Sequence, residues 1–339
     1  MHTSDPPIDP DLLEVESDPA LRLVEEGLPA AAPRSTWLRR HSKGVSIAFG
    51  VSVTAALVIG LYGKRQDFVE ALGSASLWVL TGAVALQVVW LIARSEAWHV
   101  CVVAAGGDCG RRPLYRAAAI GYLGNLLNSS FGLAVRIAEL RRTAPSTAPR
   151  AGALVAAELP IVVIEMALAA ICSFTLIGPL GIPWWTPLIA LAVAFGFVAG
   201  LSRLANRKRE GFWSGIAVMR GLRHRNQIIA LTIFAVLAQV FRNWLVLKGI
   251  GVDVTILDSV ALLVAAAAIG LLPVGPSLGI TSSVLILGSK GVAAVAAAGA
   301  LLTATGAVGA VCFASWAMAD RWRGRRASQA GPQEQPKAG

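Results

Sequence analysis

The chain has 339 residues, of which 55% are hydrophobic and only 15% are charged, against roughly a quarter charged in an ordinary soluble domain. This composition favours one polytopic membrane domain over the two soluble domains that the length alone would suggest. The formal net charge of +10 comes from Lys and Arg residues that flank apolar stretches, an arrangement typical of membrane proteins that argues against nucleic-acid binding.

Residues 1–36 differ from the rest of the chain. They contain eight of the twenty acidic residues and few large apolar side chains, a composition typical of a disordered, acidic, soluble tail. The sequence from Arg326 to Gly339 is also polar, and we expect a second disordered tail there. The transmembrane domain is therefore predicted to occupy residues 37–325.

Eight apolar segments follow one another between the tails, and most approach the length of a membrane helix. Their polarity does not alternate, as it would along the strands of a membrane barrel, so we predict an all-α helical bundle. The segments are Gly44–Tyr62, Ser74–Ala93, Ala117–Val135, Ala151–Ile177, Trp184–Leu201, Gln227–Val246, Ser259–Leu287 and Val292–Met318.

Clusters of Lys and Arg set the expected orientation, because cytoplasmic loops are richer in these residues. One cluster precedes the first segment, another lies in the loop 203–225, and a third follows the last segment. All three should be cytoplasmic, which places both termini inside the cell and the protein in the cell membrane. The uncharged connection Gly178–Pro183 should face outward.

Two segments, Ala117–Val135 and Ser259–Leu287, are interrupted by polar, Gly-rich sequence. Basic stretches lie on both sides of the first, and both stay inside only if that segment enters the membrane and returns. The second is too short for two full spans and a turn. We therefore predict six full spans and two re-entrant hairpins of opposite entry, with eight plain spans and an imperfect charge bias as the alternative.

Irregular chain at hydrocarbon depth must be buried in protein or line a wet cavity, so the two hairpin tips indicate a path for a polar substrate. Half-helix N-termini that follow each tip would favour an anionic group. The tip residues assigned to this path are Asn128, Ser129 and Gly132, and Pro273, Gly275, Pro276 and Gly279.

Basic side chains next to the apolar segments are further candidates. Arg136 follows the first tip, and its guanidinium would match phosphate oxygens; Glu139, three residues on, could pair with it. Ordinary flanking charge is the alternative for both. Arg242, one turn after Gln239, could face the same cavity or snorkel to the outer surface.

Glu158 and Glu165 are the most unusual charges, because a carboxylate in a membrane helix normally faces a cavity or a partner. They share one helix face, and Pro160 between them should kink the helix. They indicate a proton-responsive or cation-contacting site, or else static ion pairs to Arg94, Arg136 or Arg242. Arg94 itself ends the predicted second span, where snorkelling is the simpler expectation.

Signatures of catalysis are missing from the sequence. It contains no P-loop, zinc-protease motif or nucleophile elbow, and its four cysteines lack metal-ligand spacing. We predict a non-enzymatic protein with no cofactor and no metal. A membrane-embedded transferase would need an acid or base, for which Glu165 is the candidate.

Four stretches carry a resemblance to a known family. They are Arg94–Trp98, Gly124–Arg136, Ala151–Glu165 and Leu272–Ile280. Together they resemble the flippase-type transmembrane domain of lysylphosphatidylglycerol synthases and their stand-alone relatives, over about Ser74–Asp320. The resemblance implies a lipid translocase, and it adds Asn125 to the expected substrate path.

The expected function is movement of a lipid or amphiphile with a polar, phosphate-bearing headgroup between leaflets. The alternative is a non-transporting membrane partner or scaffold for a separate lipid or envelope synthase, docked through the acidic tail or the loop 203–225. The expected partners are accordingly a membrane lipid or such a synthase. Few residues follow Asp320, so we do not expect this chain to synthesise an aminoacylated lipid.

Overall fold

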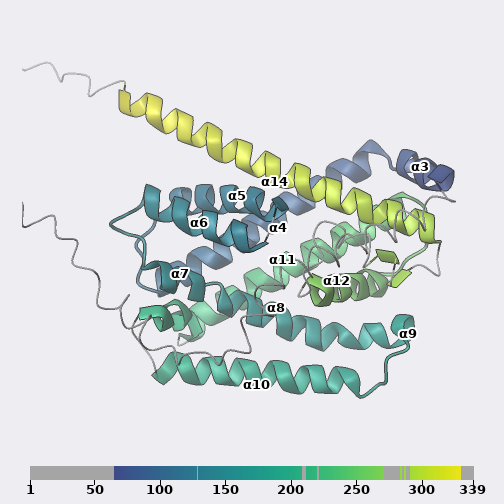
Figure 1. Cartoon of the computed structure of the whole chain (residues 1–339), viewed down its shortest axis with the longest axis horizontal. Helices are drawn as coiled ribbons and strands as arrows, with labels where there is room; N and C mark the ends of the chain where they lie inside the picture. The colour runs from purple at the N-terminus through teal and green to yellow at the C-terminus, as the bar shows by residue number, and fades with distance from the viewer. Residues whose placement is uncertain are drawn as a thin grey trace, which may run out of the picture. The chain divides into compact units, whose positions relative to one another are not determined.

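A computed structural model describes residues 65–127, 129–207, 211–219, 221–270, 283–284, 286–287 and 291–329 (Figure 1). Every regular element in these residues is helical, which confirms the all-α fold for the described part of the chain. The predicted first span, Gly44–Tyr62, lies outside the described residues. So do residues 1–36, Asn128, and the whole second tip from Pro273 to Gly279.

The described helices follow the order of the predicted apolar segments. They are α3 (Arg65–Ser74), α4 (Leu77–Ala104), α5 (Arg111–Leu127), α6 (Ser129–Thr143), α7 (Ala151–Ala156), α8 (Leu159–Cys172), η2 (Ser173–Leu176), α9 (Ile177–Leu180), α10 (Thr186–Arg207), η3 (Gly211–Met219), α11 (Leu222–Gly249), α12 (Ile256–Gly270) and α14 (Val292–Gln329).

Five described stretches are long and apolar enough to cross a membrane, and each overlaps one of the predicted full spans. They are Leu77–Ala104, Ala151–Leu180, Thr186–Leu204, Leu222–Gly249 and Val292–Arg323. The helices α5 and α6, which cover the predicted first hairpin, are not among them. The total number of spans and re-entrant hairpins stays a prediction.

The two largest extensions beyond the predicted spans are those of α4 and α14. Helix α4 continues past Ala93 to Ala104, so Arg94 lies within the helix and not at its end. Helix α14 continues past Met318 to Gln329, and its last turn lies in the sequence predicted as a tail.

The predicted kink at Pro160 is present as a break between α7 and α8. Proline has no amide hydrogen to give to the carbonyl one turn earlier, and its ring clashes with that carbonyl. Helix α7 accordingly closes at Ala157, and α8 starts afresh with Glu158 as its N-cap and Pro160 in its first turn. The break places the Glu158 side chain at a junction of two helices.

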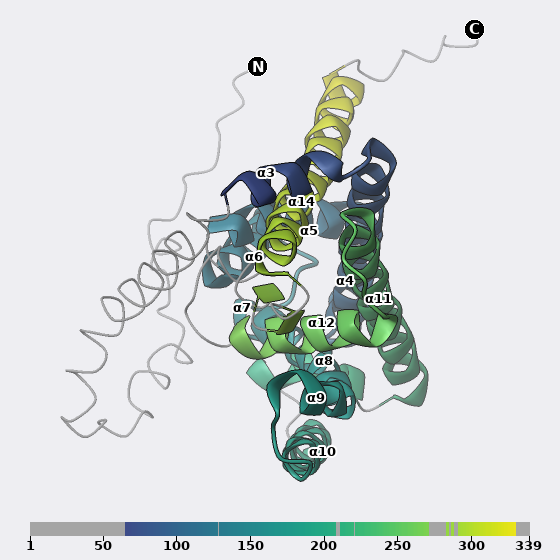
Figure 2. The same ribbon diagram turned by 90° about the vertical axis from the view of Figure 1, so that its right-hand side faces the viewer.

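Packing around α4 positions the functional residues. Helices α4 and α11 lie side by side, α14 crosses α4 and α5, and α10 packs along α8 (Figures 1 and 2). The largest apolar cluster includes Trp98, Leu114, Leu140, Leu154 and Ile161, each at most 1% exposed. It joins α4 to the α5–α6 pair and to the α7–α8 junction.

Candidate functional site

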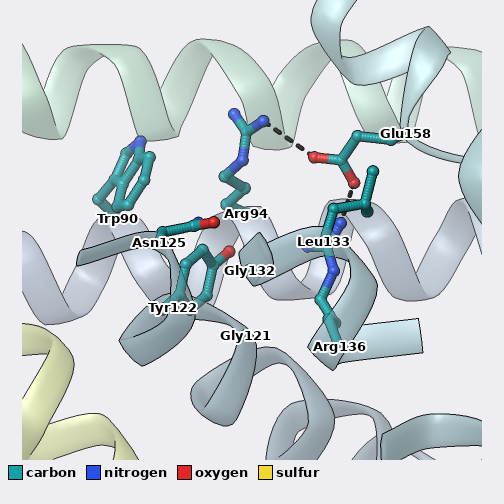
Figure 3. Close-up of a pocket in the computed structure, with 9 residues that line it drawn as sticks. All are labelled: Trp90, Arg94, Gly121, Tyr122, Asn125, Gly132, Leu133, Arg136 and Glu158. Carbon is teal, nitrogen blue, oxygen red and sulfur yellow. Dashed lines mark hydrogen bonds and ion pairs between the residues drawn. The ribbon is translucent and has the colours of Figure 1, made fainter. Parts of the chain in front are cut away.

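A cavity of about 390 Å³ lies where the α5–α6 pair meets α4 and the α7–α8 junction (Figure 3). Three of its residues carry formal charge, which is unusual between apolar helices. The lining residues are Trp90 and Arg94 from α4, Gly121, Tyr122 and Asn125 from α5, Gly132, Leu133 and Arg136 from α6, and Glu158.

The α5–α6 pair forms a tight antiparallel hairpin because glycines let the two backbones touch. A Cβ atom built on Gly121 would lie 2.9 Å from the Gly132 carbonyl oxygen, and one on Gly124 would lie 2.9 Å from the Gly132 Cα. A Cβ on Gly132 would overlap the Asn125 side chain. Small residues thus bring Asn125 and Arg136, from opposite arms of the hairpin, to one cavity.

Glu158 joins two arginines that come from different elements. Its Oε1 atom accepts a hydrogen bond of 3.0 Å from Arg94, and its Oε2 atom accepts one from Arg136 (Figure 3). Arg94 also donates to Glu165 on α8. Both glutamates therefore form ion pairs in the structure. Glu158 pairs with Arg94 and Arg136, and Glu165 pairs with Arg94.

Arg94 corrects the sequence-based expectation that it snorkels to the interface. Its side chain is 15% exposed and holds both glutamates. The prediction was wrong because α4 continues for another ten residues, to Ala104. Snorkelling needs a nearby helix end, and Arg94 has none.

Arg136 is held by an aromatic ring as well as by a carboxylate. Its guanidinium carbon lies 4.1 Å from the centre of the Trp98 ring, a cation–π geometry, and its side chain is only 6% exposed. The Arg136 Nε and Trp98 Nε1 atoms are buried without a hydrogen-bond partner among the described residues. Arg136 therefore has a buried donor that no described residue pairs with.

The charges of this cluster balance, since two arginines face two glutamates. Buried charges need partners, and here the arginines and glutamates satisfy one another. Guanidinium groups bind carboxylate and phosphate oxygens in the same planar geometry. The two arginines of the site already bind carboxylate oxygens, which are acceptors of the same kind as those of a phosphate.

Glu139 lies outside the cavity, and the Arg136–Glu139 pair suggested by their spacing is replaced by other partners. Arg136 pairs with Glu158, whereas Glu139 pairs with Arg142 at 2.8 Å and with Arg321 of α14 at 3.0 Å. The reason is that the two side chains face different neighbours, one the α7–α8 junction and the other α14.

Arg242 neither snorkels nor lines the cavity. It is 6% exposed and donates hydrogen bonds to Gln239, to Thr305 at 2.9 Å and to the Leu302 carbonyl. Gln239 in turn donates to Gln87 of α4. These contacts tie α11 to α14 and α4, which is a packing role distinct from the cavity.

The hairpin tips are only partly described. Ser129 begins α6, and its side chain is outside what the structure describes, as are Asn128, Pro273, Gly275, Pro276 and Gly279. The assignment of these residues to a substrate path stays a prediction.

Sequence reasoning missed five of the nine cavity residues, namely Trp90, Arg94, Gly121, Tyr122 and Leu133. Trp90 lies one turn before Arg94, whose guanidinium is 5.8 Å from the Trp90 ring centre. The spacing of Trp90, Arg94 and Trp98 is i, i+4, i+8, so the three share one face of α4. This spacing is visible in the sequence and could have identified the shared face. It crosses the predicted end of the second span at Ala93, which was placed too early.

Helix α4 is joined to the start of α5 by a second charged contact, at Glu96. Arg111 donates to Glu96 at 2.8 Å and Tyr115 does so at 2.7 Å. Burial, together with this hydrogen bond, raises the pKa of Tyr115 above its usual range. The Tyr115 hydroxyl thus bonds Glu96 and holds the start of α5 against α4.

The family model described as the lysylphosphatidylglycerol synthase TM region matches residues 45–318, which include every residue of the cavity. No curated protein and no solved structure matches the chain.

Proposed function

The chain belongs to the family of the lysylphosphatidylglycerol synthase transmembrane region, and on that premise we propose that it is a lipid translocase. It would move a lipid or amphiphile with a phosphate-bearing headgroup between the two leaflets. The chain is a multi-pass membrane protein with several apolar helices. The proposal goes beyond that in naming the activity and the headgroup.

One observation carries the proposal: two arginines from separate helices converge on one cavity between apolar helices. Charged side chains are expensive at membrane depth and mark ion or substrate pathways there. Arginine is the side chain that best matches phosphate oxygens, because its planar fork can donate two parallel hydrogen bonds. A phosphate headgroup supplies the matching acceptor.

The hairpin offers the route by which a headgroup reaches these arginines. Asn125 is exposed and lines the same cavity as buried Arg136. A polar headgroup can therefore pass from the Asn125 amide to the guanidinium groups, while its acyl chains stay among apolar helix surfaces. This division suits an amphiphile better than a free ion.

Transport by purified protein in liposomes tests the proposal. We expect the wild-type protein to move a fluorescently labelled phospholipid to the other leaflet, measured by chemical quenching of the exposed label. Arg136→Gln removes one of the two positive charges at the cavity and should lower the rate at least roughly tenfold, because a charge-assisted hydrogen bond to the phosphate is lost.

Arg141→Gln is the matched control, since Arg141 lies on the same helix but is exposed. It should keep the wild-type rate, and a labelled glycosyl lipid without phosphate should not be moved. Wild-type protein that moves no phosphate-bearing lipid would refute the proposal. That result would favour the alternative, a non-transporting partner of a separate synthase.

A further inference from the structure

The resting cavity already holds an anion, and it belongs to the protein. We propose that the Glu158 carboxylate occupies the position that the headgroup phosphate takes, so that a ligand has to displace Glu158 from Arg136. This inference rests on the proposed function and deepens it, because it names the group that competes with the substrate at that site.

The geometry of the bridge is the first argument. The two oxygens of Glu158 are divided between two guanidinium groups, Oε1 bonding Arg94 and Oε2 bonding Arg136. Two oxygens of one phosphate can bridge the same two arginines, because carboxylate and phosphate present acceptors to a guanidinium in the same way. The Glu158 carboxylate and the phosphate cannot both occupy the position beside Arg136 at the same time.

Unused donors beside the bridge are the second argument. Arg136 Nε is buried without a partner among the described residues, although the side chain lines the cavity. An unpaired buried donor is costly. Each oxygen of the Glu158 carboxylate already accepts a hydrogen bond from one arginine, so the Arg136 Nε–H group is left without an acceptor. A phosphate has a third acceptor oxygen that can pair with it.

The position of Glu158 in the chain is the third argument. It lies with Ala157 between α7 and α8, where the helix is broken by Pro160. Its backbone amide makes only a short-range bond of 3.2 Å, to the Val155 carbonyl. A shift of the backbone at this junction can carry the Glu158 side chain away while the interior of α8, where Glu165 sits, stays intact.

The charge balance sets the expected direction. Wild-type Arg94 and Arg136 are neutralised by Glu158 and Glu165, so an incoming anion competes with a bound carboxylate. Glu158→Gln leaves Arg136 without its carboxylate and gives the cavity one net positive charge. The variant should therefore bind a phosphate ligand more tightly than the wild type.

Calorimetric titration of the full-length purified protein in detergent tests this. The probe is dihexanoyl phosphatidic acid, with inorganic phosphate as a separate arm that distinguishes a lipid headgroup from a free ion. We expect Glu158→Gln to bind the lipid about tenfold tighter than wild type, the size of one charge-assisted hydrogen bond. Glu165→Gln is the matched control: it makes the same charge change on Arg94 alone, and its affinity should change much less.

Glu158→Asp provides a second variant if the glutamine variant does not stay monodisperse. It keeps the charge, but its side chain is one methylene shorter and cannot span both guanidinium groups, so it should also bind the lipid more tightly. Equal or weaker binding by both Glu158 variants, with binding by the wild type intact, would overturn this inference and leave the proposed function standing. Failure of every protein, wild type included, to bind either phosphate probe would refute both.

Discussion

The two arginines of the cavity are held in different ways, and the difference assigns them different roles. Arg94 uses both terminal nitrogens on carboxylates, one from Glu158 and one from Glu165. Arg136 makes one carboxylate contact and otherwise rests against the Trp98 ring. Arg94 is thus an anchor for the two glutamates, and Arg136 is the residue that can exchange partners.

Shape as well as charge should matter at Arg136, and Arg136→Lys separates the two. Lysine keeps the positive charge, but it lacks the planar fork that stacks on Trp98 and reaches two oxygens. We expect the rate of phospholipid transport in liposomes to fall roughly tenfold. Arg141→Lys on the same helix should be unaffected. A full rate for Arg136→Lys would show that charge alone suffices.

Individual residues of the site were predictable to different degrees. Arg136 and Glu158 stood out because charges in apolar sequence are rare, and the structure brings both to the cavity. Arg94 was not assigned to the site, because a charged side chain close to a predicted helix end normally reaches solvent. Its partners are 64 and 71 residues away in the chain, and one sequence does not reveal contacts over that separation.

At the scale of elements, the cavity depends on how closely α5 and α6 approach each other. Gly132 faces the backbone of α5, where a Cβ would meet the Gly121 carbonyl oxygen at 2.6 Å and overlap the Asn125 side chain. Backbone cannot move aside as a side-chain end can. The close approach of α5 and α6 therefore depends on the absence of a side chain at Gly132.

Gly132→Ala should push the two arms apart. We expect a loss of roughly 1–3 kcal/mol of stability, the range for overpacking in a filled core, with a lower thermal midpoint in detergent followed by tryptophan fluorescence. Gly178→Ala is the control, because a Cβ on Gly178 meets nothing within 4 Å. Equal midpoints for the two variants would mean that the hairpin tolerates separation.

Helix α14 fastens both arms of the hairpin with consecutive residues. Asp320 pairs with Arg116 of α5 at 2.5 Å, and Arg321 pairs with Glu139 of α6 at 3.0 Å. In the first pair α14 supplies the carboxylate, and in the second it supplies the guanidinium group. Each arm therefore has its own complementary partner on α14. The hairpin can swing away from α14 only if both pairs break.

The Arg116–Asp320 pair can be tested by exchange. Asp320→Arg places two positive charges together and should lower the thermal midpoint; the double variant Arg116→Asp with Asp320→Arg should recover most of the loss. Both side chains are about one fifth exposed, so solvent screening limits the coupling to roughly 1 kcal/mol or less. A double variant as unstable as the sum of its parts would mean that the pair contributes no coupling.

Element existence was more predictable than element length. The predominantly apolar composition of Trp184–Leu201 and Gln227–Val246 identified α10 and α11. The end of α4 was placed too early because the charges of Arg94 and Glu96 resemble a membrane boundary. In the fold both are paired with other helices, so α4 continues to Ala104.

At the scale of the whole molecule, the membrane topology determines which side of the membrane each connection faces. The basic sequence on both sides of the α5–α6 hairpin predicts that its two ends share the cytoplasmic side. The antiparallel packing of α5 on α6, each shorter than a full span, suits a segment that enters and returns. Eight plain spans would instead place the two ends on opposite sides.

Single-cysteine labelling decides between these topologies. In a background with the four native cysteines replaced by serine, Arg141→Cys and Arg112→Cys lie in exposed positions at the two ends of the hairpin. With a membrane-impermeant maleimide on intact cells, we expect neither to be labelled until the membrane is opened. Pro183→Cys, in the uncharged connection, should be labelled at once. Labelling of one hairpin end but not the other on intact cells would mean that this segment crosses the membrane, because only a segment that returns keeps both ends on one side.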